Sequence, residues 1–153
     1  MYEIALALHS WLRWIVLLAG ILVVVRSFTR AAKQNDFDST DKKLGIVFVS
    51  AFDTQIILGL VLYFVWSPLV QSALAQGGAM MKDPTLRYWG VEHIFTMLLA
   101  MLVMHIGRVF AKRAPTSPLR HKRIALTTLV ALLLVLSRIP WPFLAVGRPW
   151  FRM

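Results

Sequence analysis

The chain has 153 residues, of which 58% are hydrophobic and only 16% are charged. A soluble domain of this length would expose too much apolar surface, which favours helices solvated by lipid. The net charge of +10 is concentrated in a few segments, so we expect anionic lipid headgroups rather than nucleic acid as the partner. The absence of cysteine excludes disulfides, thiolate metal sites and c-type haem attachment within the chain.

Four long apolar stretches predict four membrane-spanning helices in one domain, residues 1–153. The expected helices cover residues 4–28, 44–66, 86–110 and 122–138. The first three have close to the roughly 20 residues that span a hydrocarbon core, and the fourth is shorter. The short connections predict an all-α, up-down-up-down bundle. No small-residue cleavage motif follows the first stretch, so we expect a retained helix rather than a signal peptide.

Basic residues concentrate in the first and third connections, and this predicts the orientation. The first connection contains Arg26, Arg30, Lys33, Lys42 and Lys43, and the third contains Arg108, Lys112, Arg113, Arg120, Lys122 and Arg123. The second connection, residues 67–87, contains only Lys82 and Arg87. Both basic connections are therefore expected in the cytoplasm, with both termini outside. Ser39 or Thr40 is the expected cap of the second helix.

Two histidines occupy matching depths in the first and third expected helices. His9 precedes Arg26 by 17 residues, about 25 Å of helix, and His93 precedes Arg108 by 15 residues, about 22 Å. In an up-down-up-down bundle these two helices are diagonal, so inward-facing side chains on them meet across the core. A facing imidazole pair is what an axially ligated b-type haem requires. His9 and His93 are therefore the predicted metal ligands, in the outer half of the bilayer.

Charged side chains near this histidine pair suit a ligand that carries carboxylates. The predicted propionate or quinol partners are Arg13, Lys82, Arg87 and Arg138. Guanidinium groups match carboxylates through paired hydrogen bonds. Glu92 is expected either to pair with an arginine such as Arg13 or Arg87 or to move protons beside a quinol. Gly20, Gly59 and Gly90 leave room either for a flat macrocycle or for close helix packing.

Three further titratable residues lie in or near the expected spans. Asp53 is expected to take up protons, to pair with a basic residue of the first or third helix, or to make a structural hydrogen bond. His105 lies near the inner end of the third helix without a buried histidine partner, which argues against a second haem. His121 lies among basic residues and is expected to contact lipid headgroups.

These patterns predict a haem-b-binding membrane electron-transfer protein or subunit that exchanges electrons between quinol and a redox partner. Two alternatives stay open. One is a haem-free quinone or small-ligand pocket lined by His9, Trp11, Trp14, Arg87, Glu92 and His93. The other is a structural accessory subunit of a larger membrane complex. The sequence does not decide whether the protein is an enzyme.

Several motifs together resemble a known family. They are His9-Ser-Trp-Leu-Arg-Trp14, Met80-Met-Lys-Asp83, Leu86-Arg87, Val91-Glu-His93, Ile106-Gly-Arg108 and Ser137-Arg-Ile-Pro-Trp-Pro-Phe143. The chain resembles, over nearly its whole length, small bacterial four-helix membrane proteins commonly labelled cytochrome b or cytochrome b-like. The resemblance implies a bacterial cytoplasmic membrane and one outer-face site. That site would comprise His9, Arg13, Lys82, Arg87, Glu92, His93 and Arg138.

Overall fold

The computed structural model describes residues 1–151, and every regular element in this range is helical. The six α-helices are α1 (Tyr2–Ala32), α2 (Ser39–Val61), α3 (Pro68–Ala75), α4 (Pro84–Arg87), α5 (His93–Lys112) and α6 (Ser117–Ser137). A π-helical turn, η1 (Leu62–Trp66), extends α2, and a second, η3 (Tyr88–Glu92), joins α4 to α5. A 3₁₀ segment, η2 (Gly77–Lys82), precedes α4. The predicted all-helical class is confirmed.

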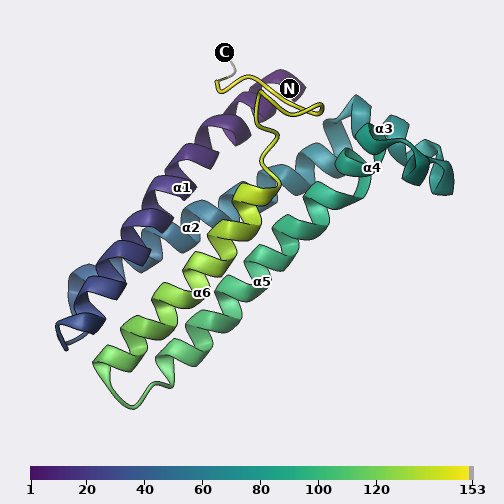
Figure 1. Cartoon of the computed structure of the whole chain (residues 1–153). Coiled ribbons are helices and arrows are strands. Elements are labelled where there is room, and N and C mark those ends of the chain that lie inside the picture. The colour runs from purple at the N-terminus through teal and green to yellow at the C-terminus, as the bar shows by residue number, and fades with distance from the viewer. Residues whose placement is uncertain (152–153) are drawn as a thin grey trace.

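The four long helices lie side by side (Figure 1). α6 packs along both α1 and α5, and α2 packs along α1, whereas α2 and α5 touch over a shorter length. The short helices α3 and α4 lie at the same end of the molecule as the N-terminus and the segment after α6 (Figure 1). The connections α1–α2 and α5–α6 lie at the opposite end, and most of the basic residues lie in or beside these two connections.

Residues 67–87, the second expected connection, are largely helical. Ser67 caps α3, because its side-chain oxygen accepts a hydrogen bond from the amide of Val70. Asp83 caps α4 by accepting from the amides of Thr85 and Leu86. In both helices a proline follows the cap, where its missing N–H costs nothing. The two prolines therefore begin new helices here rather than only ending the preceding segments.

Three helical stretches are long and apolar enough to cross a membrane: Tyr2–Ala32, Ser39–Trp66 and Pro84–Lys112. Large apolar side chains such as Leu18, Phe64 and Phe95 remain exposed on them, while Phe48 and Met104 lie in the shared core. The fourth expected span, α6, begins with Arg120, Lys122 and Arg123 and is not among these candidates.

α5 and α6 approach closely at Gly107. A Cβ atom added there would lie 2.3 Å from Cβ of Thr127. Only glycine permits this contact, which is a common device in helix packing within membranes. The close approach holds the basic ends of α5 and α6 together.

A cluster of ion pairs closes the connection between α1 and α2. Asp38, and neither Ser39 nor Thr40, is the N-cap of α2, so that prediction was wrong. The carboxylates of Asp38 and Asp41 each accept a hydrogen bond from the other residue's backbone amide. The amide of Asp41, together with the nearby guanidinium groups of Arg30 and Arg26, lowers the pKa of Asp38 below its usual range. Arg26 donates to Asp41 at 2.6 Å and lies 3.1 Å from Asp38.

Replacing Asp41 with alanine is expected to lower the free energy of unfolding by about 1–3 kcal/mol, because it removes the side chain that bonds the Asp38 amide in the capping box and the carboxylate closest to Arg26. Thermal unfolding of the detergent-solubilised protein measures the effect. The control is Asp36→Asn, which neutralises an exposed carboxylate on the same connection. Equal unfolding midpoints for the two variants would contradict this role of Asp41.

Candidate functional site

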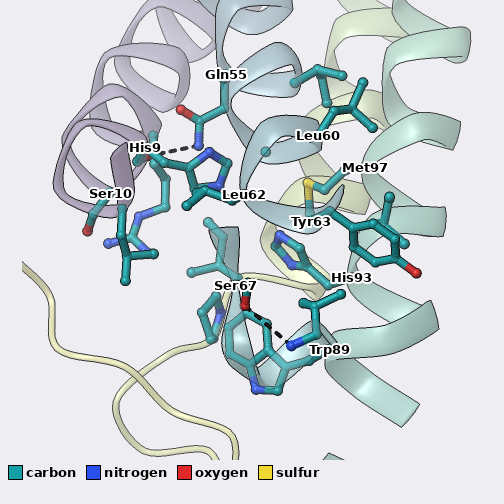
Figure 2. Close-up of a pocket in the computed structure, with 18 of the residues that line it drawn as sticks. His9, Ser10, Gln55, Leu60, Leu62, Tyr63, Ser67, Trp89, His93 and Met97 are labelled. Carbon is teal, nitrogen blue, oxygen red and sulfur yellow. Dashed lines mark hydrogen bonds between the residues drawn. The ribbon is translucent and has the colours of Figure 1, made fainter. Parts of the chain in front are cut away.

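A cavity of about 160 Å³ lies at the end of the helices near the N-terminus, and both predicted ligands line it. His9 comes from α1 and His93 from the first turn of α5, and their imidazole rings face the same space (Figure 2). Most of the other lining residues are apolar, including Phe52, Ile56 and Met97. The sequence prediction that these two histidines meet at one site is therefore consistent with the geometry.

The ring of His93 is held in one tautomer. Its Nδ1 lies 2.8 Å from the carbonyl oxygen of Arg138, and a carbonyl only accepts hydrogen bonds, so Nδ1 carries the proton. The hydroxyl of Tyr88 donates to the same oxygen at 2.7 Å. Nε2 of His93 therefore keeps its lone pair. This arrangement, a backbone carbonyl fixing the far nitrogen, is typical of histidines that ligate metals.

The ring of His9 lies against Gly59 of α2. A Cβ atom at Gly59 would be 3.1 Å from Cε1 of His9, so a larger residue would press on the ring. The side-chain amide of Gln55 donates to the backbone carbonyl of His9 at 2.9 Å and ties α2 to α1 at this level. Nδ1 of His9 is buried and has no hydrogen-bond partner among the described residues. A buried ring nitrogen without a partner is costly and indicates a missing ligand or water.

Arg13 and Arg148 also line the cavity, and none of its lining residues is acidic within the described range 1–151. Arg13 donates to the carbonyl oxygen of Trp150 at 2.9 Å, and its buried Nε has no partner there. The guanidinium of Arg148 lies 5.0 Å from the centre of the Trp89 ring. Two cations in an apolar site without a carboxylate favour an anionic ligand.

The segment after α6 crosses this end of the molecule and is fixed by aromatic contacts. Trp14 donates from its indole nitrogen to the carbonyl of Trp150 at 3.2 Å. Trp11 packs against Phe151 with ring centres 4.9 Å apart, and Trp141 packs against Trp150 at 5.4 Å. These aromatic contacts thus hold the tail that brings Arg148 to the cavity.

The remaining predicted site residues lie beside the cavity rather than in it. Glu92 pairs with Arg87 at 2.7 Å, as one of the sequence alternatives predicted, and Arg138 lies 3.7 Å from its other carboxylate oxygen. Arg138 contributes to the cavity through its backbone carbonyl, which holds His93. Lys82 is exposed on η2 and is not among the lining residues.

Sequence reasoning did not assign Arg148, Gln55 or Tyr63 to the site, and all three line it. Gln55 and Tyr63 lie four residues before and four residues after Gly59, about one helical turn on either side, so helical spacing from Gly59 would have indicated them. Arg148 carries no such signal, because it reaches the site through an irregular segment. Of the three glycines considered, Gly20 packs against Phe48 and Leu132 instead.

Asp53 and His105 form a pair away from the cavity, between α2 and α5. Nε2 of His105 lies 2.9 Å from a carboxylate oxygen of Asp53, which confirms pairing with the third expected helix. The side chain of Asp53 is 36% exposed and that of His105 is 45% exposed. They lie between α2 and α5, which contact each other less than the other neighbouring long helices do. His121 was expected at the lipid headgroups, but it is fully buried, 5.2 Å from the Phe37 ring, so that prediction was wrong.

Within residues 1–151 no group of three or more His, Cys, Asp or Glu side chains is placed to hold a metal ion. A haem needs only two axial ligands from protein, since the porphyrin supplies the other four nitrogens. Comparison with protein-family models, curated proteins and solved structures found no match to this chain. The geometry therefore carries the functional argument.

For the pair between α2 and α5, replacing only Asp53 or only His105 with leucine is expected to cost about 1 kcal/mol, because each leaves an unpaired polar group on an apolar surface. The double replacement should return close to the wild-type stability. A double-mutant cycle on thermal unfolding measures the coupling energy. Additive effects of the two single variants would show that the side chains do not interact.

Proposed function

We propose that α1, α2, α5 and α6 form an up-down-up-down bundle across a bacterial cytoplasmic membrane, with both termini outside. The three long apolar stretches support insertion. The basic residues gather at the end opposite the histidine cavity, and the positive-inside rule assigns that end to the cytoplasm. The cavity then lies in the outer half of the bilayer.

We propose further that the cavity binds one b-type haem between His9 and His93. The main support is the hydrogen bonding of the two imidazole rings. His93 donates from Nδ1 to the carbonyl of Arg138 and keeps a lone pair on Nε2, while His9 faces the same cavity with an unpartnered ring nitrogen. Two neutral imidazoles with lone pairs are what axial ligation of haem iron needs.

The charges of the lining residues support the same ligand. Arg13 and Arg148 lack carboxylate partners within the described residues and are suited to hold the two propionates. Apolar side chains line most of the cavity, and an apolar surrounding strengthens the attraction between charged groups. A haem held there would supply one-electron transfer between a membrane quinol and a redox partner.

The first test is the reduced-minus-oxidised absorbance spectrum of protein purified after expression with ample haem. We expect the sharp α-band of a low-spin, bis-imidazole haem. His9→Ala and His93→Ala should each abolish it, because each removes an axial ligand. The matched control is His105→Ala, which removes a histidine of α5 outside the cavity and should leave the band intact. Full retention of the band in His93→Ala would refute the assignment.

A second candidate function is favoured by the size of the cavity. A cavity of roughly 150 Å³ binds a single benzene ring, and this one measures about 160 Å³, so one ring fits it as it stands, whereas a porphyrin would require its walls to move apart. A quinone head is one ring, and the guanidinium of Arg13, whose Nε has no partner among the described residues, lines the wall as a donor for a quinone oxygen. In this function the protein is colourless and binds quinone without haem.

Organic extraction of the purified, colourless protein would then yield a quinone in stoichiometric amount. Gly59→Leu should reduce the yield severalfold, because the new side chain fills the space against His9. Gly78→Leu is the control, since nothing lies within 4 Å of a Cβ atom at that position. Protein that carries neither haem nor quinone would leave the structural accessory role as its function.

A further inference from the structure

A second cavity, of about 220 Å³, lies at the basic end of the long helices. Its lining includes five basic side chains from all four long helices: Arg26, Lys42, Arg108, Lys112 and Arg120. We call this cavity the basic pocket. Asp41 is the one acidic residue that lines it within the described part of the chain.

Asp41 does not neutralise this pocket, because its carboxylate is already engaged. One oxygen accepts from Arg26 at 2.6 Å, and the other accepts from the backbone amide of Asp38 at 2.9 Å. The carboxylate of Asp41 therefore belongs to the cap of α2. Four basic side chains remain without a carboxylate in ion-pair distance among residues 1–151.

Arg108 and Arg120 are held in place while their charge stays unpaired. Arg108 donates to the carbonyl of Gly45 at 3.1 Å, and a Cβ atom at Gly45 would lie 3.0 Å from the same guanidinium nitrogen. Arg120 lies with its guanidinium 3.7 Å from the centre of the Phe37 ring. Its Nε is buried and has no hydrogen-bond partner in the described residues. Both guanidinium groups are thus positioned by neutral groups and retain donors for a ligand.

We propose that the basic pocket binds a phosphate group between Arg108 and Arg120, with Lys42 and Lys112 nearby. Guanidinium groups recognise phosphate oxygens through paired hydrogen bonds, and basic pockets between membrane helices on the cytoplasmic side bind anionic headgroups. An anionic phospholipid headgroup and soluble phosphate share this chemistry. The site is separate from the histidine cavity, and only the lipid source rests on the membrane placement proposed above.

Native mass spectrometry of protein released from phosphatidylglycerol–phosphatidylcholine nanodiscs tests the lipid source. Wild-type protein should retain phosphatidylglycerol. Arg108→Gln/Arg120→Gln should retain about tenfold less, because it removes both guanidinium groups. The matched control is Arg113→Gln/Lys122→Gln, which removes two exposed charges from the same end outside the pocket and should retain lipid like the wild type.

Thermal unfolding in detergent tests whether soluble phosphate binds the pocket. The unfolding midpoint is measured in inorganic phosphate and in chloride at equal ionic strength. A rise in the unfolding midpoint with phosphate, absent in Arg108→Gln/Arg120→Gln, supports the site even if no lipid is retained. Equal lipid retention by the two double variants, together with no difference between phosphate and chloride for the wild type, overturns it. The phosphate comparison uses wild-type protein and so decides the question even if the pocket variant fails to fold.

Both measurements are independent of the haem proposal. Arg108 and Arg120 lie outside the histidine cavity, so the absorbance spectrum should be the same in both double variants. A colourless protein that retains phosphatidylglycerol would refute the haem and support the phosphate site. A haem-bearing protein that shows neither lipid retention dependent on Arg108 and Arg120 nor stabilisation by phosphate would support the haem and refute the phosphate site.

Discussion

The carbonyl oxygen of Arg138 is the acceptor on which the histidine cavity depends. α6 ends at Ser137, so this carbonyl has no partner within a helix and is available to side chains from elsewhere. His93 and Tyr88 both use it, from α5 and from the π-helical turn before it. The end of one helix thereby fixes the tautomer of a histidine on another. From the same point the chain turns into the tail that carries Arg148 to the cavity wall.

The same rule, that polar groups in an apolar setting need partners, divides the charged residues of this chain into two classes. In the first class each charge has a partner of opposite charge within the protein, as in the pairs Glu92–Arg87 and Asp41–Arg26. The guanidinium groups of four other arginines at the two cavities contact carbonyl oxygens and aromatic faces rather than carboxylates; they are Arg13, Arg108, Arg120 and Arg148. Because guanidinium groups without carboxylate partners lie at both ends of the helices, we expect an anionic ligand at each end.

The sequence was sufficient for the features that depend on hydrophobic length and helical spacing. It predicted the all-helical class and four membrane-spanning stretches, of which three are long and apolar enough in the structure. It also placed His9 and His93 at similar depth, because depth along a helix follows from residue number, and both line one cavity. It did not predict the features set by tertiary contact. The role of Arg148 depends on the path of an irregular tail, and the burial of His121 depends on Phe37 folding over it. The helices between residues 67 and 87 were missed because their caps and prolines are equally typical of turns.

A haem in the cavity would constrain where its partners lie. His9 is about 25 Å along α1 from Arg26 at the basic end, and the described polar pair between these levels is Asp53 with His105. A carboxylate–imidazole pair exchanges protons but does not carry electrons. If the proposed haem and orientation hold, electrons would enter and leave at the end where α3, α4 and the tail lie (Figure 1). Phe143, Trp150 and Phe151 are exposed on that tail and offer an apolar surface to a redox partner.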